Sequence, residues 1–106
     1  MFDENDVETA FQMLADTDER HGKLSGHVEY LKEAMKQAKA HVFLQSEGTV
    51  AERQEKAIAS VLYDNAVKEW IEAYKQFKIL DNQRNTQARN FDMFQTLSAN
   101  RRKGML

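Results

Sequence analysis

Apolar and small side chains recur at steps of three and four residues along the first half of the chain. The stripe consists of Val7, Phe11, Leu14, Leu24, Val28, Leu31, Met35, Ala38 and Val42. Alternating steps of three and four keep one face of an α-helix turned toward a partner helix, whereas a half-buried strand alternates every second residue. The pattern therefore predicts a first helix over about residues 5–46, with a coiled-coil-like apolar seam.

A short polar segment around Gly48 interrupts this stripe. Gly48 suits the left-handed backbone conformation that closes the C-terminus of a helix. Thr49 and Glu52 have the spacing of a capping box, in which both side chains accept hydrogen bonds from unpaired N–H groups of a first turn. We therefore expect a turn at 47–49 and a second helix over about residues 50–100, followed by a basic tail at 101–106.

The second predicted helix carries two apolar stripes. The first stripe is Leu62, Ala66, Trp70, Ala73, Phe77 and Leu80, and the second is Tyr63, Val67, Ile71 and Tyr74. One partner helix covers only one side, so the second side requires burial elsewhere. We expect an all-α fold, a long antiparallel helical hairpin that pairs with another copy into a helical bundle. The candidate oligomer interface is Tyr63, Val67, Trp70, Ile71 and Tyr74.

Gly22 and Gly26 lie one turn apart inside the first predicted helix, next to a polar run of poor helix formers. Glycine in a helix interior is less favourable than Ala by about 1 kcal/mol. Two interpretations follow: a kink or split of the helix over residues 21–26, or a close approach of a neighbouring helix at these two positions. The one-turn spacing favours the close approach.

Charge is distributed unevenly between the two ends of the chain. Residues 1–20 hold seven acidic residues and one basic residue, whereas residues 75–106 hold seven basic and two acidic residues. A hairpin folded at Gly48 places residues 3–19 beside about residues 77–93, so opposite charges meet there. We expect Asp16, Asp18 and Glu19 to form a solvated face opposite Arg84 and Arg89.

The composition restricts the class of protein. The 106 residues suit a single helical domain, and 42% hydrophobic with 30% charged residues fits neither a disordered chain nor a membrane span. Residues 1–8 are acidic where a secretory signal carries Lys or Arg. We therefore expect a cytoplasmic protein with no membrane segment.

No pattern of catalytic or metal-binding residues is present. The chain has no Cys, which excludes disulfides, thiolate zinc sites and a cysteine nucleophile. His21 and His27 are six residues apart, which does not match the i, i+4 spacing of a helical zinc motif, and His41 stands alone. No glycine-rich phosphate loop is present either. We therefore expect no enzyme activity, no metal and no cofactor.

The basic tail is the clearest candidate for nucleic-acid binding. Arg101, Arg102 and Lys103 extend past the first helix in the hairpin, and Phe91 and Phe94 lie a few turns before them. Three cations suit phosphate contacts, and the two rings suit stacking on the bases of a single strand. The alternative is that the cations satisfy the last carbonyls and the negative end of the helix dipole. The net charge of −2 disfavours a general binder of duplex DNA.

Three short segments resemble a group of small, all-helical, early-region proteins of tailed bacteriophages. These segments are Leu14-Ala15-Asp16-Thr17-Asp18-Glu19, Glu47-Gly48-Thr49-Val50-Ala51-Glu52-Arg53 and Leu97-Ser98-Ala99-Asn100-Arg101-Arg102-Lys103-Gly104. Members of the group are encoded near genes for recombination or single-strand handling and have no assigned catalytic activity. The resemblance implies a phage origin and an accessory role during infection of a bacterium, and it assigns no binding residue.

Together these observations predict a non-enzymatic, homo-oligomeric phage protein that binds another macromolecule in DNA replication or recombination, in the cytoplasm of an infected host. The partner is expected to be a phage or host protein of nucleic-acid metabolism. Two alternatives remain. In the first, the chain inhibits a host enzyme or defence complex, and the acidic N-terminal surface of the chain imitates phosphate charge. In the second, the chain binds single-stranded nucleic acid directly.

Overall fold

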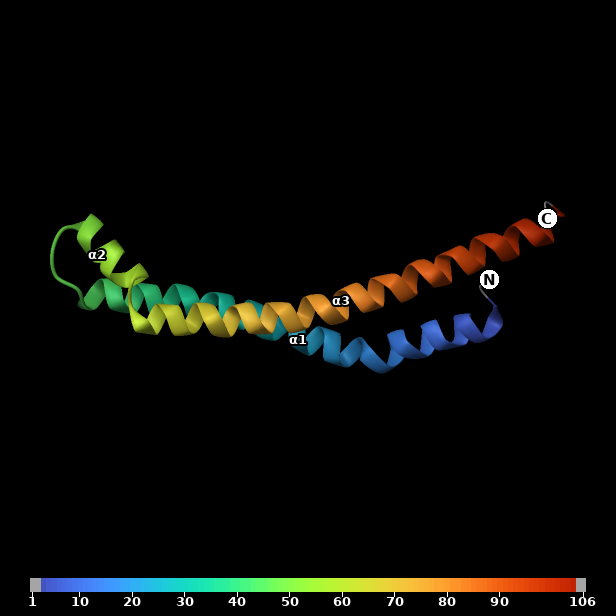
Figure 1. The fold of residues 1–106 in the computed structure, drawn as a ribbon, viewed down its shortest axis with the longest axis horizontal. Coiled ribbons are helices and arrows are strands. Elements are labelled where there is room, and N and C mark those ends of the chain that lie inside the picture. The colour runs from blue at the N-terminus through green and yellow to red at the C-terminus, as the bar shows by residue number, and fades with distance from the viewer. Residues whose placement is uncertain (1–2, 105–106) are drawn as a thin grey trace. The chain divides into compact units, whose positions relative to one another are not determined.

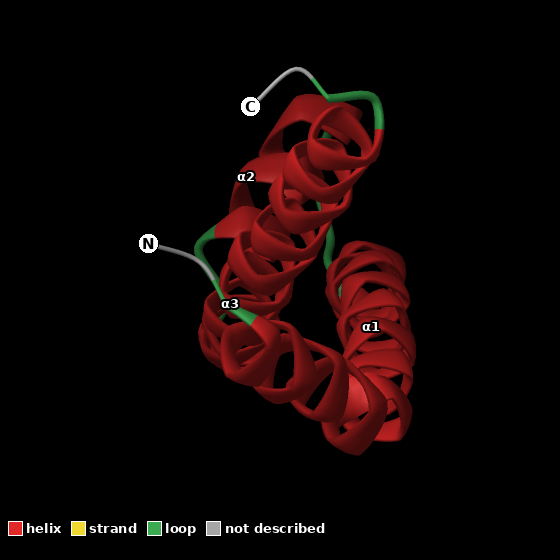
Figure 2. Cartoon of the chain, turned by 90° about the vertical axis from the view of Figure 1, so that its right-hand side faces the viewer, coloured by secondary structure: helices red, strands yellow, loops and turns green. Residues whose placement is uncertain are grey.

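A computed structural model of the chain describes residues 3–104, and within this range it contains three helices and no strand. The helices are α1 (Glu4–Gln45), α2 (Val50–Ile58) and α3 (Val61–Arg102) (Figure 1). Loops occur only near the two ends and on either side of α2 (Figure 2). The prediction of an all-α fold is confirmed.

The chain forms two compact units, and each contains an antiparallel pair of helical segments. One unit joins the first part of α1, up to residue 22, with α3 from residue 78 onward. The other comprises residues 23–77, which are the rest of α1, the whole of α2 and the beginning of α3. Within each unit the α1 segment packs along the α3 segment in the opposite direction, so the predicted antiparallel hairpin is confirmed. The expectation of a single domain stays a prediction.

The connection between α1 and α2 agrees with the sequence prediction. Gly48 has a φ of 117°, a conformation that side-chain-bearing residues rarely adopt. Thr49 is the N-cap of α2, and its Oγ1 accepts a hydrogen bond from the backbone N–H of Glu52 at 3.2 Å. The Ser46 hydroxyl donates to the carbonyl of Val42 at 2.6 Å, next to the last residue of α1. Side-chain capping therefore fixes both helix ends at this turn.

The prediction of one unbroken helix over 50–100 is wrong, because the chain leaves the helix at Ala59 and Ser60. The Ser60 hydroxyl donates to the carbonyl of Ala57 at 2.7 Å, and its oxygen accepts from the N–H of Tyr63 at 3.2 Å. A serine that bonds to the backbone on both sides offers an alternative to continued helix and caps the next one. Ser60 therefore ends α2 and starts α3.

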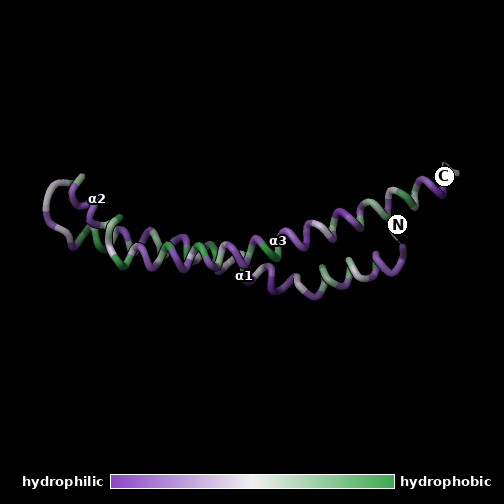
Figure 3. Tube along the Cα trace, viewed as in Figure 1, coloured by the Kyte–Doolittle hydropathy of each residue, from purple (hydrophilic) through white to green (hydrophobic). Residues whose placement is uncertain are grey.

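The predicted end of the second helix near residue 100 is close to the observed end of α3 at Arg102, so Arg101 and Arg102 belong to the helix and not to the tail. The polar stretch from Asp81 to Asn90 is helical throughout, and the tube over it is mostly purple in Figure 3. Lys103 and Gly104 form a turn after the helix, and the last two residues of the predicted tail lie outside the described residues. The basic residues are therefore presented mainly by the last helical turn.

Neither interpretation of Gly22 and Gly26 holds in full. α1 runs unbroken through both positions, so the expected split is wrong. The favoured close approach is wrong too, because a Cβ atom built at either glycine would meet no heavy atom within 4 Å. Both positions are exposed. The glycines therefore reduce helix propensity without making a packing contact.

Gly22→Ala and Gly26→Ala are each expected to stabilise the protein by about 0.5–1 kcal/mol, because Ala loses less backbone entropy in a helix. Gly48→Ala is the contrasting variant, since φ at that position is 117° and the added Cβ would lie 3.3 Å from the Cβ of Glu52. It is expected to destabilise by about 1–3 kcal/mol. Urea unfolding followed by circular dichroism measures all three. A loss of stability in Gly22→Ala would show that a neighbouring helix does pack there.

The core of the unit at residues 23–77 is small. Val28, Leu31 and Ala73 are its buried residues, with Trp70 and Phe77 packed against them. Ile58, Leu62 and Ile71 of this unit retain 54%, 48% and 52% of their surface. The packing of this unit therefore leaves apolar side chains exposed that a partner molecule can cover.

Candidate functional site

The predicted oligomer interface lies on one flank of α3, within the unit at residues 23–77. Tyr63 and Val67 are half-buried, while Ile71 and Tyr74 retain 52% and 41% of their surface. Their spacing of three and four residues places the four side chains on one side of the helix. We call Tyr63, Val67, Ile71 and Tyr74 the α3 stripe. It is the exposed apolar face that the sequence pattern predicted.

Trp70 has a different environment from the other four predicted interface residues. Its ring packs against the core of its own unit and stacks on Tyr74, with ring centroids 5.2 Å apart and an interplanar angle of 22°. Its Nε1–H is buried and has no hydrogen-bond partner. Trp70 therefore contacts the core on one side and Tyr74 of the α3 stripe on the other.

The α3 stripe lies on the same side of the unit as two lysines of α1. A shallow hollow marks the other side, where His27 of α1 faces Glu72 of α3. Lys36 is nine residues beyond His27, and at about 100° per residue it points to the opposite side of α1. Val67 is five residues before Glu72, which places it about 140° around α3 from the Glu72 carboxylate. Lys36 of α1 and Val67 of the α3 stripe therefore both lie on the side of the unit away from the hollow.

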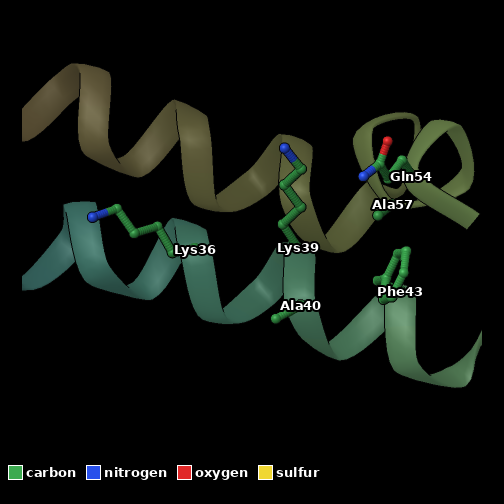
Figure 4. Close-up of a pocket in the computed structure, with 6 residues that line it drawn as sticks. All are labelled: Lys36, Lys39, Ala40, Phe43, Gln54 and Ala57. Carbon is green, nitrogen blue, oxygen red and sulfur yellow. The ribbon is translucent and has the colours of Figure 1, made fainter. Parts of the chain in front are cut away.

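A groove of about 310 Å³ lies on this face, between the end of α1 and α2. Its lining residues are Lys36, Lys39, Ala40, Phe43, Gln54 and Ala57. In Figure 4 the ring of Phe43 lies next to Ala57, and Lys39 reaches from α1 toward α3. Ala57 is fully buried and Phe43 half-buried. The groove combines an apolar floor with two lysines, of which Lys36 also pairs with Glu33 at 3.1 Å. It suits an apolar side chain with a carboxylate beside it.

Contacts beside the groove hold α2 against α1. The guanidinium of Arg53 lies 4.2 Å from the centroid of the Phe43 ring, and its Nε donates to the Phe43 carbonyl at 3.1 Å. Lys56 Nζ donates to the carbonyl of Glu47 at 2.7 Å. These bonds satisfy carbonyls near the end of α1 and fix the groove wall. This groove was not predictable from the sequence pattern, because it depends on the break at Ser60.

The candidate nucleic-acid residues lie at the end of α3. Arg101 and Arg102 occupy its last turn, Lys103 follows, and all three are exposed. Phe91 and Phe94 are half-buried. Arg101 follows Phe94 by seven positions, about two turns, so both lie on similar sides of the helix, while Arg102 and Lys103 point elsewhere. The structure therefore gathers the three cations at one helix end without aligning all of them with the rings.

A polar network joins α1 and α3 in the unit that contains residues 3–22. Arg84 donates from Nη1 to the Leu14 carbonyl and to Thr17 Oγ1, both at 2.8 Å, and from Nη2 to Asp18 Oδ1 at 3.1 Å. The prediction that Asp16, Asp18 and Glu19 lie opposite Arg84 is therefore confirmed for Asp18. The contacts with Thr17 and Leu14 were missed, because sequence charge patterns give no information about hydroxyl or carbonyl acceptors.

His21 lies in the same unit and takes part in packing between the helices. Its Nε2 is 2.8 Å from Asp81 Oδ1, and both side chains are about a quarter exposed. Across residues 3–104 no group of three or more His, Cys, Asp or Glu residues is arranged to hold a metal ion. Within the same range no helix is both long and apolar enough to span a bilayer.

Comparisons of the chain with protein-family models, with curated proteins and with solved structures found no match. The class of protein is therefore defined by the fold alone, which is an all-α antiparallel helical hairpin.

Proposed function

We propose that this chain is a non-enzymatic accessory protein of a tailed bacteriophage. It acts by binding another macromolecule in DNA replication or recombination, in the cytoplasm of the infected bacterium. The observation that carries the binding role is the α3 stripe, which exposes Ile71 and Tyr74 beside a small core. Exposed contiguous apolar side chains mark interaction sites. The phage origin and the DNA context rest on the three sequence segments that resemble early-region phage proteins.

The same stripe supports self-association. A second copy packed on it would cover Ile71 and Tyr74 and bring four helical segments together, which is the arrangement of a helical bundle. Pairing by a two-fold axis places the same patch of both copies at the interface and closes the assembly. We propose a homo-oligomer built on this face. The partner protein then binds the assembled oligomer, and Ile71→Glu removes this binding by dissociating that oligomer.

Affinity capture tests the proposed function. The tagged chain is expected to capture from infected cells a protein that acts on DNA, identified by mass spectrometry, and nuclease treatment is expected to leave that capture intact. The variant Ile71→Glu is expected to lose it, while Ile79→Glu, which changes another exposed isoleucine of α3, is expected to keep it. Capture that is identical for both variants, or only of proteins unrelated to nucleic acid, would contradict the proposal.

A second candidate function is direct binding of single-stranded nucleic acid, favoured by the exposure of Arg101, Arg102 and Lys103 together. Fluorescence anisotropy of a labelled oligonucleotide tests it. Three phosphate contacts give a slope of about −2 in log K against log salt concentration. Replacing the three cations with Ala is expected to abolish binding. The matched control replaces Lys32, Lys36 and Lys39 with Ala. Absence of binding by the wild type at low salt would dismiss this function.

A further inference from the structure

The groove beside Phe43 has chemistry that the α3 stripe lacks. Its floor is apolar, and Lys36 and Lys39 line it, with the Lys36 ammonium bound to Glu33 Oε1 at 3.1 Å. Its volume of about 310 Å³ is at the lower end for ligand pockets and accommodates a single aromatic side chain. A complementary surface must therefore offer one exposed ring with carboxylates close to it.

The first turns of α1 present such a surface. Phe11 retains 64% of its surface although it is a large aromatic residue. Glu4 and Glu8 precede it by seven and three residues and are exposed, so they lie on the same face of the helix. Ala15, four residues after Phe11, is also exposed and leaves the ring accessible. We call Glu4, Glu8, Phe11 and Ala15 the acidic face.

We propose that the acidic face of one copy docks into the groove of a second copy, with Phe11 against Phe43, and with Glu4 and Glu8 near Lys36 and Lys39. Charge complementarity favours a second copy as the occupant, because residues 1–20 carry a balance of −6 and Lys39 and Lys36 line the groove. Lys36 also pairs with Glu33, and this exposed pair is screened by solvent. Burial of one aromatic side chain removes about 150–250 Å² from water. The charge pairs fix orientation more than they add affinity.

The docking is reciprocal when the two copies are related by a two-fold axis. Each copy then donates one Phe11 and receives one, so no binding surface stays open and the assembly stops at a dimer. This inference rests on the self-association proposed above and adds a named contact to it.

Charge exchange is the first test. Lys36→Glu with Lys39→Glu, and separately Glu4→Lys with Glu8→Lys, are each expected to weaken self-association about tenfold or more in sedimentation at low salt. An equimolar mixture of the two double variants is expected to associate as tightly as the wild type, because each acidic groove meets a basic face and each basic groove meets an acidic face. The control is Arg20→Glu with Arg89→Glu, two exposed cations outside the groove and the α3 stripe, which is expected to change association less than threefold, a tolerance set by the small effect of screened surface charges.

Disulfide trapping is the second test. Because the chain has no native Cys, only the introduced thiols can form a disulfide. A chain with Phe11→Cys is mixed with a chain with Ala40→Cys under oxidation, and a covalent dimer of the two different chains is expected. In a chain carrying both substitutions the two sites lie on one helix about 43 Å apart, so any bridge must join two molecules. His41→Cys replaces Ala40→Cys in the control, because His41 is exposed and lies about 100° around α1 from Ala40.

The outcomes separate this docking from self-association in general. A wild-type monomer at 100-fold the concentration used for capture overturns both. If Ile71→Glu dissociates the oligomer while the charge variants and the Ala40→Cys mixture behave as their controls, self-association stands and the docking of the acidic face is overturned. If the mixture of charge variants fails to associate, the pairing of these charges is overturned, and circular dichroism verifies that both variants stay helical.

Discussion

Arg84→Ala is expected to lower the free energy of unfolding by about 2–3 kcal/mol. The guanidinium reaches from α3 to the Leu14 carbonyl, the Thr17 hydroxyl and the Asp18 carboxylate, and its side chain is only 16% exposed. Most of the effect is expected from the carbonyl and hydroxyl contacts, since Asp18 is 78% exposed and its ion pair is screened by solvent. Urea unfolding measures the change.

Two matched variants isolate the source of this effect. Asp18→Asn removes only the screened charge and is expected to cost less than about 0.5 kcal/mol. Arg89→Ala removes an exposed arginine of the same helix and is expected to be within about 0.5 kcal/mol of the wild type. Amide hydrogen exchange is expected to accelerate near Thr17 and Asp81 in Arg84→Ala. Equal losses in Arg84→Ala and Arg89→Ala would show that the hydrogen bonds to α1 contribute nothing.

Trp70→Ala is expected to destabilise the unit at residues 23–77 by about 2–3 kcal/mol, because the half-buried ring covers part of a small core. Loss of the stacking contact at 5.2 Å from Tyr74 adds to this cost and frees the tyrosine ring. The α3 stripe then loses its support, so self-association is expected to weaken together with stability. Thermal unfolding and sedimentation of the same samples measure both effects.

Trp70→Phe provides the sharper comparison. Phe keeps a ring in the core and removes the buried, unpaired Nε1–H, whose desolvation costs about 1–3 kcal/mol. The smaller ring and the removed donor offset each other, and the change in stability is expected to stay within about 1 kcal/mol. Tyr30→Ala changes an aromatic residue that is 70% exposed and is expected to have little effect. A cost for Trp70→Phe as large as that for Trp70→Ala would mean that the indole makes a specific contact.

Helix positions were predictable because they depend on local chemistry. The apolar spacing around Val28 and Leu31 and the Thr49 cap act over a few residues, and both appear in the structure as expected. The Ser60 break was missed because the apolar pattern continues across it on both sides. A Ser three residues before Tyr63 was the available signal, and its two backbone hydrogen bonds outweigh the helix propensity of the neighbouring alanine.

Some features of the candidate surfaces were also predictable from the sequence, and others were not. The exposure of Ile71 and Tyr74 followed from counting apolar stripes, because a single partner helix covers only one of two sides. The role of Trp70 did not follow, since its position on α3 lies between the core and the α3 stripe and only packing decides its direction. The close approach expected at Gly22 failed for a related reason, because helix spacing says nothing about how near another backbone comes.

By itself, the sequence determined that this protein is helical, that it folds back at Gly48 and that opposite charges meet between its ends. These are consequences of periodicity, backbone freedom and Coulomb attraction, which act locally or over whole segments. Only the tertiary structure decided that Arg84 binds a carbonyl and a hydroxyl of α1, and that α2 turns back to form a groove with Phe43. Both depend on the rotation of one helix against another, and that rotation is set by side-chain packing between residues far apart in the chain.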